Sequence, residues 1–300
     1  MADQIHILVT GGTGQVGLEL LTTDWPEGII LHAPNRNELD MSDSASIRRA
    51  FARQSYAAVI NSGAWTAVDK AESEAAAAFA VNSHAPAVMA DLARDAGIPM
   101  IQVSTDYVFD GSKADPYDEN DPVGPIGVYG ASKLAGELAV RTIQPRSVVL
   151  RIAWVLSPHR ANFLKTMLRL AADRPLLRVV DDQRGCPTSA RDIAHAIRTI
   201  ALRMIQDPAA PTGVYHFVNS GVTTWAGLAR EILRLSDEAG GPSAEVEGIT
   251  TDQYPTPARR PAHSALATEK LSRDYGVAPR SWAEAVAEIV NAVQSQGRGA

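Results

Sequence analysis

Short apolar runs alternate with longer amphipathic stretches along the first half of the chain. The apolar runs are rich in Val, Ile and Leu and too short for helices, which predicts buried strands over 5–12, 28–33, 57–64, 99–109 and 147–156. Between them, apolar positions recur at helical spacing, which predicts helices over 15–23, 44–54, 71–97 and 129–142. Asp43 or Ser44 is a suitable cap for the second helix. Strands that alternate with helices indicate an α/β fold with a parallel sheet and right-handed crossovers.

Beyond about residue 155 the pattern changes. It predicts a strand, a loop and a helix over 176–205, a further strand over 213–221, and helices over 162–175, 224–240 and 282–296. The segment 250–271 is rich in Pro and polar residues, and we expect it to lie over a pocket. We therefore expect one domain over 1–155 and a smaller α/β lobe over 156–300, with some segments of the lobe returning to the sheet.

Composition and charge narrow the class of protein. The 300 residues are 45% hydrophobic and 21% charged, as in ordinary globular proteins. A net charge of −6, without a stripe of Lys and Arg, argues against a nucleic-acid partner. No apolar run approaches the ~18 residues that span a bilayer. The first residues lead straight into a strand and do not resemble a signal peptide, so we expect a cytoplasmic protein without a membrane partner.

The chain has one cysteine, Cys186. A single cysteine excludes an intramolecular disulfide and a cysteine-based metal cluster. We expect Cys186 in the core or in the wall of a pocket.

Three glycines form a G-x-x-G-x-x-G pattern within TGGTGQVG (10–17). Gly11, Gly14 and Gly17 follow the first predicted strand and open the first predicted helix, which is the context of a dinucleotide-binding turn. Glycine lets the backbone approach a pyrophosphate, and the helix N-terminus offers free N–H groups to it. The alternative is a plain turn between a strand and a helix.

The stretch after the second predicted strand bears on the choice of cofactor. An acid about 20 residues past the glycines is typical of NAD sites, where it binds the adenosine ribose. LHAPNRNELD (31–40) has no acid at the strand end and carries Arg36 instead, which is suited to a 2′-phosphate. We therefore favour NADPH without excluding NADH, while a surface arginine is the alternative. Asp40 and Met41 are placed to touch the adenine end.

Tyr129 and Lys133 lie four residues apart and so share one face of a predicted helix. They follow the strand over 99–109, which ends with the hydroxyls of Ser104 and Thr105, and open α/β sheets bind ligands at such strand ends. Hydride addition to a ketone makes an alkoxide that needs a proton. Free tyrosine, with a pKa of about 10, exchanges protons poorly at neutral pH. The Lys133 ammonium would lower that pKa, and Thr105 would donate to the developing oxyanion. The alternative is a solvated helix start.

Together these motifs resemble the extended short-chain dehydrogenase/reductase superfamily, through TGGTGQVG, VSTDYVF and YGASK. Within it, the chain is similar to the dTDP-4-dehydrorhamnose reductase family. The blocks that carry this closer resemblance are TAVDKAESE (66–74), STDYVFDG (104–111), YGASKLAGE (129–137), ANFLKTMLRLA (161–171), DDQRGCPT (181–188), GVYHFVNSG (213–221) and YPTPARRP (254–261). With the first strand they run from residue 7 to about 271, which is nearly the whole chain.

The resemblance implies a Rossmann-type doubly wound sheet with a C-terminal nucleotide-sugar-binding lobe. It implies reduction of dTDP-4-dehydro-L-rhamnose to dTDP-L-rhamnose by NAD(P)H, the last step of dTDP-L-rhamnose synthesis. Tyr129 would donate the proton, Lys133 would lower its pKa and bind the ribose, and Thr105 would tune the tyrosine and touch the sugar. The implied pyrophosphate contacts are Gly14, Gln15 and Val16, and those after the third strand are Ala64, Trp65 and Thr66. Some relatives carry His where this chain has Trp65.

The same resemblance places the sugar nucleotide against Asp106 and Trp154. Arg259 and Arg260 are our candidates for its diphosphate, because guanidinium forks match phosphate oxygens; the alternative is a solvated pair of charges. Three other residues are weaker candidates for the substrate site, and each of them suits a structural role equally well: Asn162, Gln183 and Trp225.

Some relatives are thought to dimerise through a magnesium ion held by glutamates. The sequence offers no compact carboxylate cluster, the acids at 72–74 read as a helix start, and Arg191 stands where a glutamate would be needed. We therefore predict no metal, and leave open a homodimer.

Two alternative functions remain. A related epimerase or dehydratase would need further acid–base groups, and a dehydratase would carry an Asp-Glu pair after Thr105, where this chain has Asp106 and Tyr107. A non-catalytic, cofactor-binding regulatory subunit is the other, and the presence of Thr105, Tyr129 and Lys133 argues against it.

Overall fold

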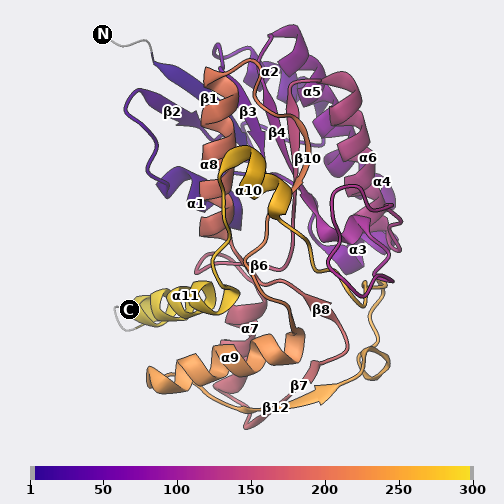
Figure 1. The fold of residues 1–300 in the computed structure, drawn as a ribbon, viewed down its shortest axis with the longest axis vertical. Coiled ribbons are helices and arrows are strands. Elements are labelled where there is room, and N and C mark those ends of the chain that lie inside the picture. Colours follow the sequence, from indigo (N-terminus) through magenta and orange to yellow (C-terminus); the bar gives the residue numbers. More distant parts are fainter. Residues whose placement is uncertain (1–3, 298–300) are drawn as a thin grey trace.

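The computed structural model describes residues 4–297, and a six-stranded parallel sheet forms its larger part (Figure 1). The strands lie in the order β10-β5-β4-β3-β1-β2, and every neighbouring pair is parallel. Their bounds are β1 (Ile5–Thr10), β2 (Ile29–His32), β3 (Ala58–Asn61), β4 (Met100–Thr105), β5 (Ser147–Ile152) and β10 (Gly213–His216). The strand order changes direction between β1 and β3, and open α/β sheets bind ligands at such a point. The predicted α/β fold with a Rossmann-type sheet is confirmed.

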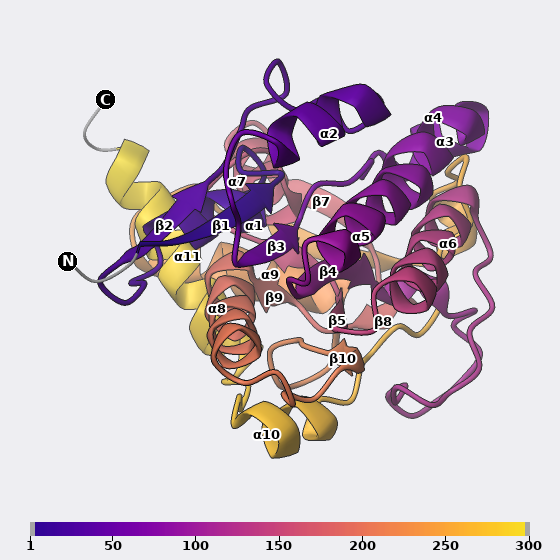
Figure 2. The ribbon, with the colours of Figure 1, turned by 90° about the horizontal axis from the view of Figure 1, so that it is seen from above.

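Helices cover both faces of the sheet (Figure 2). Alternate residues of a strand point to opposite faces, so Leu8 packs against one helical layer while Ile7 and Val9 pack against the other. The first layer is α2 (Ser44–Phe51), α5 (Ala85–Asp95) and α6 (Val128–Ile143). The second is α1 (Gln15–Thr22) and α8 (Ala190–Gln206), with α10 (Glu269–Tyr275) beside β10.

Several predicted elements are shorter or more broken than the sequence indicated, among them the following two. The helix expected over 71–97 is divided into α3 (Val68–Ser73), α4 (Ala75–Phe79), a π-helical turn η1 (Ala80–His84) and α5. Glu74, at φ −124° and ψ 45°, interrupts it first. The strand expected over 99–109 ends at Thr105, whose hydroxyl accepts from the Tyr107 N–H and starts a 3-10 turn, η2 (Asp106–Val108).

The rest of the chain forms a second layer of elements below the sheet in Figure 1. It comprises β6 (Val155–Leu156), α7 (Phe163–Ala171), β7 (Leu176–Val180), β8 (Arg184–Gly185), β9 (Thr188–Ser189), β11 (Thr223–Thr224), α9 (Trp225–Glu238), β12 (Glu245–Ile249), η3 (Thr251–Gln253) and α11 (Trp282–Gly297). These elements share a separate apolar core. Although they lie beyond residue 155, α8 and β10 pack with the main sheet. The exact boundary between the lobes stays a prediction. Among residues 4–297, no helix combines the length and the apolar character needed to cross a membrane.

Candidate active site

The glycine turn between β1 and α1 is packed too closely for side chains. A Cβ at Gly17 would lie 2.1 Å from the Gly11 carbonyl oxygen, and one at Gly11 would lie 2.5 Å from the Gly63 nitrogen. Gly11 has φ +73°, a region that favours glycine. Gly14 is the N-cap of α1 and forms no side-chain hydrogen bond, so no capping side chain occupies the N–H groups of the first turn. These residues fit the pyrophosphate of a dinucleotide.

Gln15 and Val16 follow in the first turn of α1. Val16 is 8% exposed and packs into the sheet core, so only its backbone is free to touch a cofactor. The Gln15 Oε1 accepts from Ser157 Oγ at 2.8 Å and from Asn162 Nδ2 at 2.9 Å. Asn162, a weak substrate candidate from the sequence, therefore braces the glycine turn.

The loop after β2 brings the predicted adenosine contacts beside the turn. Arg36 is exposed on this loop. Asp40 accepts from the Ser42 N–H at 2.9 Å, and this bond, with that of the Ser42 hydroxyl, lowers the Asp40 pKa. Met41 packs against the loop after β3, next to the glycine turn, because a Cβ on Gly63 would lie 2.4 Å from the Met41 sulfur and 3.3 Å from the Gly11 nitrogen.

The loop after β3 carries Ala64, Trp65 and Thr66, and a residue that the sequence did not single out holds it in place. Asn82, in the π-helical turn, accepts from the Trp65 N–H at 2.8 Å and donates to the Trp65 carbonyl at 3.1 Å. Its amide also donates to Ser132 Oγ at 3.0 Å, on α6. Insertions of this kind in a helix are frequent at functional sites.

Tyr129 lies in the first turn of α6, near the carboxyl end of β4. The phenol lies beside the Thr105 hydroxyl, and its ring meets that of Tyr107 edge-on with centroids 5.7 Å apart. Burial raises the pKa of Tyr129 to about 12, and the neighbouring Thr105 hydroxyl offsets only part of this. The direction differs from the lowering that was expected from Lys133.

Lys133 is 4% exposed and lies one turn further along α6. Its Nζ donates to the Val103 carbonyl at 2.6 Å, and this bond ties α6 to β4. Burial lowers the pKa of Lys133 to about 8, and the nearby carboxylate of Glu137 counteracts part of that shift.

Ser104, the other hydroxyl at the end of β4, belongs to a buried polar group behind the site. It donates to Glu137 Oε1 at 2.5 Å, and Arg151 forms a buried ion pair with the same carboxylate at 2.7 Å. The Ser104 proton is therefore used inside the protein. The Thr105 hydroxyl, which lies beside Tyr129, also donates inside the protein, to Asp106 Oδ1 at 2.9 Å.

Asp106 and Cys186 are both buried, and the charge of Asp106 adds to the raised pKa of the Cys186 thiol. Burial raises the pKa of Asp106 to about 6, and hydroxyls of Ser264 and Thr105 oppose the shift. Cys186 is 3% exposed, and burial raises the pKa of its thiol to about 11. A thiol in this state is a poor nucleophile.

Trp154 has a strained backbone, with φ 45°. It lies two residues after the end of β5 and interrupts the strand that was predicted over 147–156. The Trp225 ring stacks on it with centroids 3.5 Å apart and planes 5° apart. A Cβ on Gly185 would lie 2.4 Å from the Trp154 ring. Because Trp225 covers one face of that ring, Gly185 must lie against the other face. Trp154 therefore offers a ligand an edge and not a face. Gln183 accepts from the Trp225 indole N–H at 3.2 Å.

The two predicted diphosphate ligands differ in their surroundings. Arg260 pairs with Asp69 of α3 at 2.9 Å, while the Asp69 carboxylate also accepts from the Ala258 N–H. Arg259 is exposed beside it. The segment over 250–271 is thus fastened to α3.

Glu72, one of the acids expected at a helix start, serves a different helix. Its Oε1 accepts from the Val128 N–H at 2.8 Å, at the N-terminus of α6, where the capping residue Gly127 offers no side chain. A carboxylate there is favourable for the helix dipole and fixes the turn that carries Tyr129.

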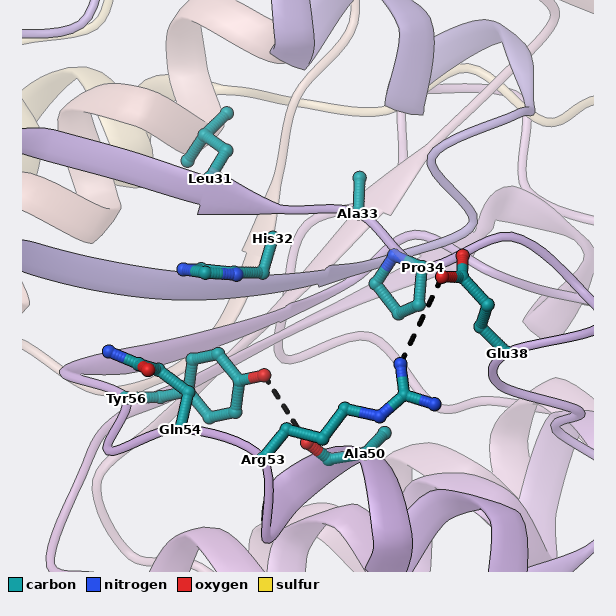
Figure 3. Close-up of a pocket in the computed structure, with 9 residues that line it drawn as sticks. All are labelled: Leu31, His32, Ala33, Pro34, Glu38, Ala50, Arg53, Gln54 and Tyr56. Carbon is teal, nitrogen blue, oxygen red and sulfur yellow. Dashed lines mark hydrogen bonds and ion pairs between the residues drawn. The ribbon is translucent and has the colours of Figure 1, made fainter.

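Two cavities lie apart from these residues. One of about 360 Å³ lies beside the edge strand β2 (Figure 3). It is lined by Leu31, His32, Ala33, Pro34, Glu38, Ala50, Arg53, Gln54 and Tyr56. Figure 3 shows the Arg53–Glu38 ion pair, at 4.0 Å, along one side of it. Another of about 350 Å³ lies beside α8 and is lined by residues that include Asp192, His195 and Arg280. Neither includes Thr105, Tyr129 or Lys133.

The structured part of the chain, residues 4–297, has no group of three or more His, Cys, Asp or Glu side chains arranged to hold a metal ion. Arg191 lies 3.9 Å from Glu288 Oε2, and the same oxygen accepts from Arg280 at 2.8 Å.

Comparisons with known proteins agree with this arrangement. A family model described as RmlD substrate binding domain matches residues 5–295. A protein from Sinorhizobium fredii named dTDP-4-dehydrorhamnose reductase is 42% identical over 297 residues, which cover 99% of this chain and 100% of that protein.

Solved structures give the same result. The crystal structure of a dTDP-4-dehydrorhamnose reductase from Clostridium acetobutylicum matches with a TM-score of 0.90 and 33% identity, covering 97% of this chain and 100% of that one. The enzyme of that name from Bacillus anthracis, solved in complex with NADP, matches with a TM-score of 0.88 and 29% identity, covering 96% and 99%. The similarity thus extends over both lobes and beyond the glycine turn.

Proposed function

The chain belongs to the family described as RmlD substrate binding domain, and from this premise we propose that it reduces the C4 ketone of dTDP-4-dehydro-L-rhamnose to dTDP-L-rhamnose with NADPH. It is an oxidoreductase that uses NADP(H), as the complex of its Bacillus anthracis relative supports. The observation that carries the proposal is that Tyr129, beside Thr105, and Lys133, bonded to the Val103 carbonyl, both lie against the end of β4, the strand that follows the glycine cradle and β3 in the sheet.

NADPH supplies the hydride that forms the new C4–H bond. As the carbonyl electron pair moves onto oxygen, Tyr129 gives that oxygen its phenolic proton, and the tyrosinate keeps the O–H electron pair. A pKa raised to about 12 by burial keeps the phenol protonated at neutral pH, so the proton is present when needed. The Thr105 hydroxyl would stabilise the tyrosinate by turning its O–H away from Asp106 Oδ1, to which it donates at 2.9 Å. The Lys133 ammonium, with its pKa of about 8, is present below that pH.

The residues that would hold the cofactor lie along the switch point of the sheet. The turn from Gly11 to Gly17 would bind the pyrophosphate and Arg36 the 2′-phosphate. The loop over 64–66 would line the middle of the cofactor, and Lys133 would bind the nicotinamide ribose.

The sugar nucleotide would enter from the side of the second lobe. Asp106 and the edge of Trp154 would flank the sugar beside Tyr129 and Thr105. Because Arg260 is already paired with Asp69, Arg259 is the guanidinium more available to a diphosphate.

The direct test is NADPH oxidation with enzymatically generated dTDP-4-dehydro-L-rhamnose. We expect oxidation with this substrate, faster with NADPH than with NADH, and little with UDP- or GDP-linked 4-keto sugars. Conversion of the sugar without net oxidation of NADPH would indicate an epimerase or dehydratase. Binding of NADPH without any turnover would indicate a regulatory subunit. Either result would overturn the proposal.

A further inference from the structure

The loop over 157–162, between β6 and α7, is fastened to the glycine turn. Ser157 and Asn162 both donate to the Gln15 side-chain oxygen. Asn162 also accepts from the Lys165 N–H at 3.1 Å and so caps α7. The loop therefore joins the first helix of the second lobe directly to the turn that fits a pyrophosphate.

Arg160 is the tip of this loop. Its backbone has φ +54°, which is unfavourable for a residue with a long side chain. Its Nε donates to the Thr13 carbonyl in the glycine turn at 2.7 Å. Within residues 4–297 its two terminal nitrogens have no hydrogen-bond or ion-pair partner, and the side chain is exposed. Backbone strain of this kind persists where the surroundings fix it, and it is frequent at ligand sites.

The charges around the glycine turn indicate what Arg160 could bind. The stretch over 10–22, which contains the turn and α1, has no Lys or Arg. Its acid, Glu19, lies 3.2 Å from His159 Nε2 of the same loop. A dinucleotide brings the negative charge of a pyrophosphate to this turn, and Arg160 is the cation that the loop brings there.

We propose that Arg160 binds the pyrophosphate of the dinucleotide, so that the cofactor is held by groups from both lobes. The two free nitrogens of its guanidinium supply charge-assisted donors that the glycine turn lacks. The proposal rests on the dinucleotide-binding part of the proposed function and not on its sugar substrate.

The decisive variant is Arg160→Gly, tested by the Kd of NADPH and of NADH measured from nicotinamide fluorescence without any sugar. Glycine adopts φ +54° without strain, so the thermal midpoint of the cofactor-free protein should stay the same or rise. Both Kd values should rise about tenfold or more, and by the same factor, because both dinucleotides carry the pyrophosphate. Unchanged affinity for both would overturn the proposal.

Three further variants separate this role from others. Arg160→Lys keeps the charge and should regain most of the lost affinity; failure to do so would assign the loss to loop geometry and overturn the proposal. Arg36→Ala should weaken NADPH and spare NADH, and the same selectivity in Arg160→Gly would also overturn it. Arg169→Ala removes an exposed charge from α7 and should leave both Kd values unchanged. If the sugar assignment fails but these results hold, the inference stands.

Discussion

Tyr129 is held in its protonated form by burial and by the neighbouring charge of Asp106, both of which raise its pKa. Burial raises its pKa to about 12, which is the opposite of what a general base at neutral pH requires. A reductase needs a donor, and a neutral phenol beside the Thr105 hydroxyl is one. In the reverse direction the same tyrosine would have to lose its proton first, so sugar oxidation should need a higher pH than ketone reduction.

The first prediction concerns this phenol. Tyr129→Phe should lower kcat about 10²- to 10⁴-fold, because only the proton donor is removed. The Kd of NADPH should stay within a factor of a few, which fluorescence titration measures. Tyr254→Phe, at a tyrosine that is 60% exposed, is the matched control and should behave as the wild type. Near-normal turnover of Tyr129→Phe would contradict its role.

Local motifs made part of the site predictable from the sequence. The glycines, Tyr129 and Lys133 could be found because their spacing along one turn or one helix face is itself the signal. Asn82 and the Asp69–Arg260 pair could not, because they act on partners 50 and 191 positions away, through side chains of types that are common on any surface. No sequence pattern connects positions so far apart.

At the scale of elements, the break after β5 shows where the hydrophobic pattern misleads. Apart from Ser147 and Arg151, the run over 147–156 is apolar, and it contains no Gly or Pro, so a continuous strand was the natural prediction. The chain turns at Trp154 because its carbonyl accepts from Thr188 and its ring is enclosed by Trp225 and Gly185. Contacts made by distant elements decide the end of this strand.

The second prediction tests that enclosure. Gly185→Ala adds a methyl group 2.4 Å from the Trp154 ring, and overpacking of this kind should cost about 1–3 kcal/mol of unfolding free energy. Urea unfolding measures the loss, and the near-UV circular dichroism of the stacked indoles should weaken with it. Gly124→Ala is the control, since its added carbon meets only Asp110, at 3.7 Å. Equal stability of the two variants would show that Trp154 is free to move.

At the scale of the whole molecule, His216 couples the sheet edge to the segment over 110–127. Its Nδ1 lies 3.2 Å from the Tyr117 carbonyl, and its N–H donates to Glu119 at 3.1 Å. Burial, with the charge of Arg151, lowers the His216 pKa to about 3. The ring is therefore neutral in the folded protein.

The third prediction follows from that shift. The His216 side chain takes up a proton near pH 6.5 in the unfolded state but not in the folded state. The free energy of unfolding is therefore not reduced by this group above pH 6.5. It decreases as the pH falls from 6.5 towards about 3. By pH 5 the loss should reach about 2 kcal/mol. Between pH 7 and pH 5, the unfolding free energy of His216→Asn should decrease less than that of the wild type. The control His84→Asn, at an exposed site, should show the same decrease as the wild type. Parallel decreases in all three proteins would contradict it.

The position of β10 at the edge of the sheet also bears on how the protein is made. A ribosome delivers β5 some sixty residues before β10, and α8, which covers the same face, emerges between them. Until then β5 is an open edge with Val148 and Leu150 uncovered, and such edges pair with other chains. The sheet can therefore be completed only after residue 216 has been synthesised. We expect a chain released at residue 155 to aggregate rather than to fold.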